Sequence, residues 1–461
     1  GVISITTIPK LEELSIGSNT FENVDDLSLN GLSGLKRVII GENSLVNKEG
    51  DFTLRNCTNL NELRVGNGSM KFFKSIEFDS VPSLERIAIG PNTYMNVNEL
   101  RLNGLSKLER VEISENSFSR KQGMFELKNC SKVNELVVGN GGMEQFERLE
   151  IDDVPSLEKI AIGDDCYKNV DELQLNGLSK LKRVEINANS FNGDSGDFSL
   201  TNCGSVTELV FGDGSMKSFK SIEISGVPLL ATVEIGSNSF SNVLEWELNG
   251  LPQLRRVVIG DDSFTNKTGG FVLKNCASVS ELVVGNRSMS SFSSFEITTT
   301  PSLKTITIGS DSLKNVDSFV LSGLSGFKRV VIGSNSFSNK NGTFSVVNCT
   351  SLESVEIGSS SMGAYSVLSV DNTPSLEVLS IGSNAFKNVD ALRLNGLSKL
   401  KKVEISAESF TNKEGVFELT NCASVSELVV DDNGMKSFKS VEIAGVPSLE
   451  TIRVGSNVFK S

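Results

Sequence analysis

The sequence repeats with a 73-residue period, and this period constrains the fold more than any other feature. Six cysteines and seven prolines keep the period without insertion or deletion. They are Cys57, Cys130, Cys203, Cys276, Cys349 and Cys422, and Pro9, Pro82, Pro155, Pro228, Pro301, Pro374 and Pro447. Copies that follow each other so strictly bury their apolar faces against their neighbours, which is typical of a solenoid. The period therefore overrides the two or three globular domains that 461 residues would otherwise suggest.

Each 73-residue repeat divides into a 25-residue turn and two 24-residue turns, which are bounded by Leu35, Leu60, Leu84 and Leu108. A turn opens with L-x-x-[VLI]-x-[IV] and usually has Asn at its ninth position, as at Asn19, Asn43, Asn92, Asn116, Asn189, Asn238, Asn335, Asn384 and Asn457. In the second half of a turn apolar residues alternate with polar ones, as in residues 170–178. Alternation at period two predicts a strand, so each turn contains two strands.

The motif L-x-x-L-x-L-x-x-N-x-L runs through essentially the whole chain in about nineteen copies and resembles the leucine-rich repeat family. The second strand of each turn and the recurring "IGxNxF" are most similar to the BspA-like branch of that family. The resemblance implies an all-β solenoid with two short parallel strands per turn. Some turns depart from it: Gly68, Gly141 and Gly214, and elsewhere Asp165, Asp262 and Asp311, stand where Asn is expected. The hydrogen bonds of the family's asparagine ladder are not expected in those turns.

The six repeated cysteines fall in an apolar column, because the following turns have Val81 and Leu105 where the first has Cys57. Successive cysteines lie three turns apart, roughly 14 Å at strand spacing. A disulfide needs Cα atoms within about 7 Å. These residues are expected to form a structural ladder of free, buried thiols. A metal site would need several ligands at one corner, and the neighbours are apolar.

The first turn of each 73-residue repeat has one extra residue, in stretches such as "NKEGD". We expect this insertion to bulge outward, with glycine supplying a positive φ. The glycines concerned are Gly50, Gly123, Gly196, Gly269, Gly342 and Gly415.

Two charged columns mark the exposed side of the first strand. One holds Arg37, Arg110, Arg183, Arg256 and Arg329, and the next turn holds Glu62, Glu135, Glu208 and Glu281, with Ser354 breaking the column. Adjacent strands should bring each arginine against a glutamate. These residues are also the candidate contacts for a partner on an exposed face.

Two smaller features leave alternatives open. Cys166 stands where sister turns have Thr20, Thr93 or Ser239, and either a reactive role or the exchange of one small residue for another fits. The Asp pairs at 164–165, 261–262 and 431–432 could hold calcium, although calcium demands several oxygen ligands.

Sequons for N-glycosylation occur at Asn56, Asn67, Asn129, Asn266, Asn286, Asn341 and Asn348.

Composition narrows the function. The chain has no His and no phosphate-binding glycine loop, so we expect no catalytic, cofactor-binding or metal-binding residues and no enzyme. The formal charge of -13 is spread evenly, which disfavours nucleic acid as a partner. The sequence contains no run of eighteen or more apolar residues, so we expect no membrane-spanning helix. Residues 1–10 lack the features of a signal peptide.

We expect residues 1–461 to form one continuous solenoid with partial, uncapped turns at 1–10 and 450–461. One hypothesis is a structural building block of an extracellular or cell-surface fibre, which stacks head to tail with copies of itself or belongs to a longer array. The alternative is a surface adhesin or ligand-binding ectodomain that recognises a protein or glycan along one solenoid face, as the resemblance implies.

Overall fold

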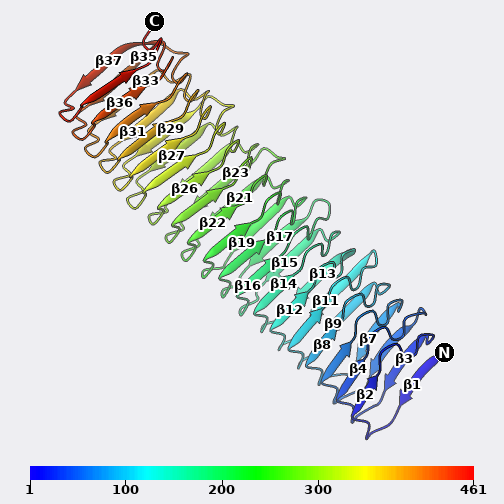
Figure 1. Ribbon diagram of the computed structural model, residues 1–461. Helices are drawn as coiled ribbons and strands as arrows, with labels where there is room; N and C mark the ends of the chain where they lie inside the picture. Colours follow the sequence, from blue (N-terminus) through cyan, green and yellow to red (C-terminus); the bar gives the residue numbers. More distant parts are fainter. Residues whose placement is uncertain (461) are drawn as a thin grey trace. The chain divides into compact units, whose positions relative to one another are not determined.

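The computed structural model describes residues 1–460, which form 38 β-strands and no helix. No helix capable of spanning a membrane therefore occurs in this part of the chain. The chain divides into two compact units, Gly1–Leu230 and the described residues from Ala231 onward. Each unit is a parallel β-solenoid with one strand in a front layer and one in a back layer per turn (Figure 1). The predicted solenoid of about nineteen turns is confirmed.

The even-numbered strands form the front layer. In the first unit these are β2 (Glu13–Ile16), β4 (Arg37–Ile40), β6 (Glu62–Val65), β8 (Arg86–Ile89), β10 (Arg110–Ile113), β12 (Glu135–Val138), β14 (Lys159–Ile162), β16 (Arg183–Ile186) and β18 (Glu208–Phe211). In the second they are β20 (Thr232–Ile235), β22 (Arg256–Ile259), β24 (Glu281–Val284), β26 (Thr305–Ile308), β28 (Arg329–Ile332), β30 (Ser354–Ile357), β32 (Val378–Ile381), β34 (Lys402–Ile405), β36 (Glu427–Val430) and β38 (Thr451–Val454). Within each unit, consecutive front strands pair in parallel over all four residues, as β10 does with β12.

The odd-numbered strands form the back layer. In the first unit these are β1 (Val2–Thr6), β3 (Asp26–Asn30), β5 (Asp51–Arg55), β7 (Ser75–Asp79), β9 (Glu99–Asn103), β11 (Gly123–Lys128), β13 (Phe146–Asp152), β15 (Glu172–Asn176), β17 (Asp197–Thr201) and β19 (Ser221–Ser225). In the second they are β21 (Glu245–Asn249), β23 (Gly270–Lys274), β25 (Ser294–Thr298), β27 (Ser318–Ser322), β29 (Thr343–Val347), β31 (Val367–Asp371), β33 (Ala391–Asn395), β35 (Gly415–Thr420) and β37 (Phe438–Ala444). Alternate residues of both layers point inward, and the core lies between the layers.

The back layer is interrupted, whereas the front layer within each unit is not. Its strands form the groups β1-β3-β5-β7, β9-β11-β13 and β15-β17-β19 in the first unit, and β21-β23-β25, β27-β29-β31 and β33-β35-β37 in the second. Among the described residues, no strand pairing joins β7 to β9, β13 to β15, β25 to β27, or β31 to β33. We call these four places seams. The strands before consecutive seams end one full repeat apart, at Asp79 and Asp152 and at Thr298 and Asp371.

A missing backbone hydrogen bond accompanies each seam. At other corners of the back layer a residue with positive φ donates its N–H to the next turn, from Gly31 to the carbonyl oxygen of Arg55 at 3.0 Å and from Asn56 to that of Asp79 at 3.0 Å. Ser80 has the same conformation, with φ of 56°, but its N–H has no such partner among residues 1–460. The corner keeps its shape while the contact to the next turn is lost.

The ninth position of a turn, usually asparagine, makes its hydrogen bond to the next turn through its backbone N–H. Asn43 has φ of 52° and donates its N–H to the carbonyl oxygen of Asn67 at 2.8 Å. Gly68 and Asp165 have φ of 67° and 58° and make the same bond at 2.8 Å. Gly, Asn and Asp are the residues that tolerate this left-handed conformation. The turns that lack Asn therefore keep a turn-to-turn hydrogen bond, contrary to the expectation drawn from the side chain.

The expectation that glycine supplies a positive φ in the first-turn insertion is wrong. None of the six glycines has a positive φ. They lie where the backbone approaches a neighbour too closely for a side chain: a Cβ on Gly50 would lie 1.1 Å from the carbonyl oxygen of Asp25, and one on Gly123 would lie 2.1 Å from the ring of Phe146. Gly269 is similar, at 1.6 Å from the carbonyl oxygen of Leu244. Close packing between turns explains these glycines.

Candidate interaction surface

The outward side chains of the front strands form ion pairs across neighbouring turns. Arg183 lies 2.8 Å from Glu208, and Arg256 lies 2.8 Å from Glu281. Arg110 pairs more loosely with Glu135, at 3.5 Å. The strand register places each arginine directly beside its glutamate.

Other members of the two columns choose different partners. Arg37 stands beside Glu62 in the register but pairs with Glu13 of the preceding turn, and Glu62 pairs with Arg64 at 3.1 Å. Arg329 faces Ser354 and pairs with Glu356 at 3.0 Å. The front layer therefore uses most of its charges for contacts within the chain.

A double-mutant cycle on Arg183 and Glu208 should give a small coupling free energy. Their side chains are 40% and 35% exposed, so water screens the pair. We expect Arg183→Ala, Glu208→Ala and the double variant to reveal a coupling of about 0.2–1 kcal/mol in urea unfolding. A coupling above about 2 kcal/mol would contradict the expectation that water screens this exposed pair.

The six repeated cysteines are buried and free. Each sits at the corner after a back strand, where its sulfur approaches the carbonyl oxygen of a leucine one turn earlier. In Cys203 the distance from Sγ to the oxygen of Leu175 is 3.5 Å, and in Cys276 the distance to that of Leu248 is 3.5 Å. Burial raises the pKa of both thiols, which outweighs the backbone hydrogen bonds that lower it. The surroundings are those of a core residue rather than a nucleophile.

Cys166 lies in a second ladder, which serine occupies in most turns. The hydroxyl of Ser44 donates to the carbonyl oxygen of Gly17 at 2.7 Å and accepts the N–H of Thr20 at 3.2 Å. Cys166 takes the same place, with its sulfur 3.2 Å from the carbonyl oxygen of Gly139. Burial raises the pKa of Cys166 to about 12. These contacts favour the exchange of one small residue for another.

Thiol titration should separate the folded from the unfolded chain. All seven thiols are buried, so we expect Ellman's reagent to find none in the native protein at about pH 8 and seven in denaturant. The pKa values of these thiols are raised in the folded chain, so the folded state disfavours the thiolates. We therefore expect the free energy of unfolding to be unaffected by the thiols below their ordinary pKa of about 8.5 and to fall as the pH rises above it, because the unfolded chain then ionises first. Rapid labelling of any thiol in the native chain would contradict this burial.

The seven sequon asparagines are all exposed, but their side chains differ in availability. The amide nitrogen of Asn56 donates to Oδ1 of Asn30 at 3.0 Å, and that of Asn129 donates to Asn103 at 2.9 Å. A glycan would replace one of the two hydrogens on each of these nitrogens and crowd the bond that the other makes. The side chain of Asn341 has no hydrogen bond among the described residues, so a glycan there would disturb the fold least.

The described residues contain no group of three or more His, Cys, Asp or Glu side chains arranged to hold a metal ion. All three Asp pairs serve the backbone instead: Oδ1 of Asp164 accepts the N–H of Ala188 at 2.9 Å, and Oδ1 of Asp261 accepts that of Asn286 at 2.7 Å. In the third pair, Oδ1 of Asp432 accepts the N–H of Ser456 at 2.6 Å. The sequence could not show this role, because it depends on which side of the corner the carboxylate faces.

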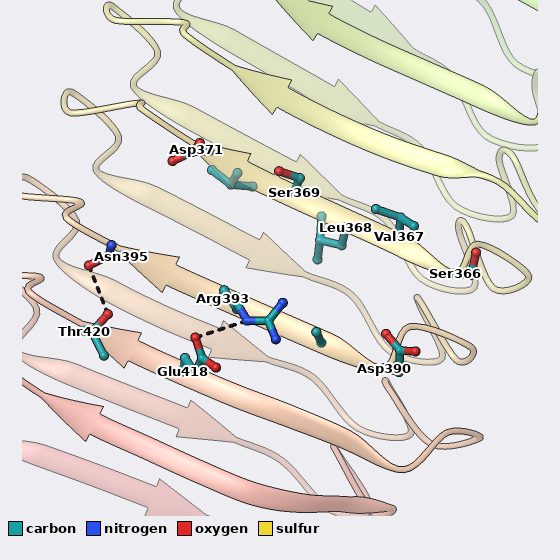
Figure 2. A pocket seen from close by; sticks show the side chains of 12 residues that line it. Ser366, Val367, Leu368, Ser369, Asp371, Asp390, Arg393, Asn395, Glu418 and Thr420 are labelled. Carbon is teal, nitrogen blue, oxygen red and sulfur yellow. Dashed lines mark hydrogen bonds and ion pairs between the residues drawn. The ribbon is translucent and has the colours of Figure 1, made fainter.

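The seams open grooves on the back layer that sequence reasoning missed. The groove between β31 and β33 has a volume of about 520 Å³ and is lined by Ser369 and Asp371 on one side and by Asp390, Arg393 and Asn395 on the other (Figure 2). Grooves of about 410 Å³ lie between β13 and β15 and between β25 and β27. A proline column marks these corners in the sequence, but the strand spacing that opens them leaves no pattern there.

Charges in the seam grooves are less completely paired than those of the front layer. Arg393 pairs with Glu418 at 3.2 Å, away from the opposite side of the groove (Figure 2). The carboxylates of Asp371 and Asp390 form no ion pair within residues 1–460, and both residues are exposed. Asp152 and Glu172 are likewise exposed and unpaired with cations in the groove between β13 and β15. Groups of this kind are available to a partner at no cost in internal ion pairs.

Comparison with known proteins fixes the family. A family model described as the BspA type leucine rich repeat region matches in six copies, over residues 16–148, 234–366 and 267–393, which together cover more than half of the chain. The chain belongs to the BspA-type leucine-rich repeat family. The predicted resemblance is confirmed. A search of curated proteins finds no significant match.

A search of solved structures returns several matches to this BspA-type protein. A leucine-rich repeat protein from Bacteroides ovatus is 15% identical, with 88% of each chain covered and a TM-score of 0.27. The functional domain of InlJ from Listeria monocytogenes, described as including a cysteine ladder, is 13% identical, with 89% of this chain and 75% of that one covered and a TM-score of 0.27. The plant peptide hormone receptor RGFR1 in complex with RGF2 is 14% identical, with 95% and 88% covered and a TM-score of 0.23.

Proposed function

We propose that this BspA-type protein is a surface or extracellular binding scaffold that recognises a protein or glycan along its back layer. One observation carries the proposal: the seam grooves present carboxylates, hydroxyls and amides that no internal ion pair consumes, as at Asp371 and Asp390. The charges of the front layer are mostly committed to each other. The proposed role is binding rather than catalysis, in keeping with a family of repeat scaffolds.

The test compares the two layers in one binding assay. The purified chain is screened on a glycan array and against extracellular-matrix proteins, and each hit is measured again with a groove variant, Ser369→Arg with Asp371→Arg. The matched front-layer variant carries Arg110→Glu, Arg183→Glu and Arg256→Glu. We expect the groove variant to lose at least tenfold in affinity and the front-layer variant to bind normally. Loss with the front-layer variant alone would move the partner to the front layer, and no specific ligand at all would reject the binding role.

A second candidate function is a building block of an extracellular fibre, formed by copies of the chain head to tail or by a longer repeat array. Repetition of the backbone hydrogen bonds from turn to turn favours it, because Asn43, Gly68 and Asp165 make the same contact to the next turn. This candidate treats residues 1–461 as one continuous solenoid. Electron microscopy and light scattering of the purified chain should then show filaments that lengthen with concentration. Monodisperse particles of monomer mass at every concentration would reject assembly.

A further inference from the structure

The junction between two back strands at one position of the repeat is paired in one copy and unpaired in another. β1 pairs with β3 over five residues, from Val2 beside Asp26 to Thr6 beside Asn30. The N–H of Thr7, at the following corner, donates to the carbonyl oxygen of Asn30 at 3.1 Å. Ser80 lies one full repeat after Thr7, at the equivalent corner, where β7 and β9 form a seam and this hydrogen bond is absent. The same junction between turns is therefore compatible with a closed and an open back layer.

The front layer stays paired on the other side of an open seam. β30 and β32, which precede β31 and β33 in the same two turns, pair over all four residues, with Ser354 beside Val378. The two turns are thus joined by a strand pairing along the front, and no strand pairing within residues 1–460 joins them along the back. A junction with one bonded side can open and close about that side without breaking the core of either turn.

We infer that the seams are compliant joints. Each alternates between the hydrogen-bonded form of β1 and β3 and the open form of β7 and β9, while the three strands between seams act as one cooperative group. The backbone N–H and C=O groups that face an open seam have no hydrogen-bond partner in the sheet, so they bond to water instead. Small movements at the seams let each unit bend once per repeat without unfolding. This inference concerns the backbone alone and does not depend on the proposed partner.

Disulfide trapping tests the closed form directly with two matched pairs that share one residue. Ser345→Cys with Ser369→Cys joins β29 to β31, where the two residues are already register partners. Ser369→Cys with Arg393→Cys crosses the seam from β31 to β33, at the same sequence offset that Val2 and Asp26 have in the closed form. The native thiols are buried and should not interfere.

We expect the pair within the group to oxidise rapidly and the seam pair to oxidise at least tenfold more slowly but to completion. If the seam pair never forms under the same oxidant, the seam does not close and the inference fails. If it forms as fast as the other pair, the seam is not a distinct open state and the inference fails as well.

Hydrogen exchange gives an independent measurement on the unmodified chain. Both edges of β29 are bonded to neighbours, so its amides should be the slowest in the group β27-β29-β31. The amides of β31 and β33 that face the seam should exchange at least tenfold faster, while β30 and β32 in the front layer stay protected. Equal protection across β29, β31 and β33 would overturn the inference.

Discussion

Replacing Gly50 with alanine should destabilise the protein by about 3 kcal/mol or more. The added Cβ would lie 1.1 Å from the carbonyl oxygen of Asp25 and 2.2 Å from its carbonyl carbon, so the backbone of one turn must move away from the next. Since Gly50 does not have a positive φ, the cost is steric and not conformational. Urea unfolding should show a clearly lower midpoint for Gly50→Ala than for the parent chain.

Gly204 provides the matched control, in the same unit of the solenoid. A Cβ on Gly204 would meet no atom within 4 Å, and its φ is not positive. Gly204→Ala should therefore change the free energy of unfolding by less than about 0.5 kcal/mol. If both variants proved equally stable, the backbone at Gly50 would have room to move, and close packing could not explain the repeated glycine.

Phe319→Ala should cost about 3–5 kcal/mol, because it removes a fully buried ring from a continuous aromatic stack. The ring centroid of Phe319 lies 5.1 Å from that of Phe337 and 5.7 Å from that of Phe344, and the ring meets Phe295 edge-on at 5.8 Å. Phe295 and Phe344 are held by their own strands, β25 and β29, and therefore cannot close the cavity.

The residue next to it in β27 provides the control for this variant. Val320 points outward and is 45% exposed, so Val320→Ala should change stability by less than about 0.5 kcal/mol. Thermal and urea unfolding of both variants should show the contrast. A loss below about 1 kcal/mol for Phe319→Ala would mean that the core between the layers is loosely packed.

The strands were predictable because their signal is local. In residues 172–176 the alternation of Leu173 and Leu175 with polar neighbours predicts a back strand, and the structure places β15 there with both leucines buried. Three features depend on distances between turns and could not be read from the sequence. A glycine needed for close approach looks like one needed for a positive φ. An arginine between two glutamates, such as Arg37, can pair with either. An open seam has the same alternating pattern as a closed one.

The backbone character of the turn-to-turn contacts has a consequence for how such genes change in length. Asn43, Gly68 and Asp165 offer the next turn the same N–H, so a turn does not need to recognise the particular side chains that follow it. Duplication or loss of a 73-residue cassette would join surfaces that already fit, whereas any other length would misplace the close-packed glycines. Natural variants of this chain are therefore expected to differ in size by whole cassettes.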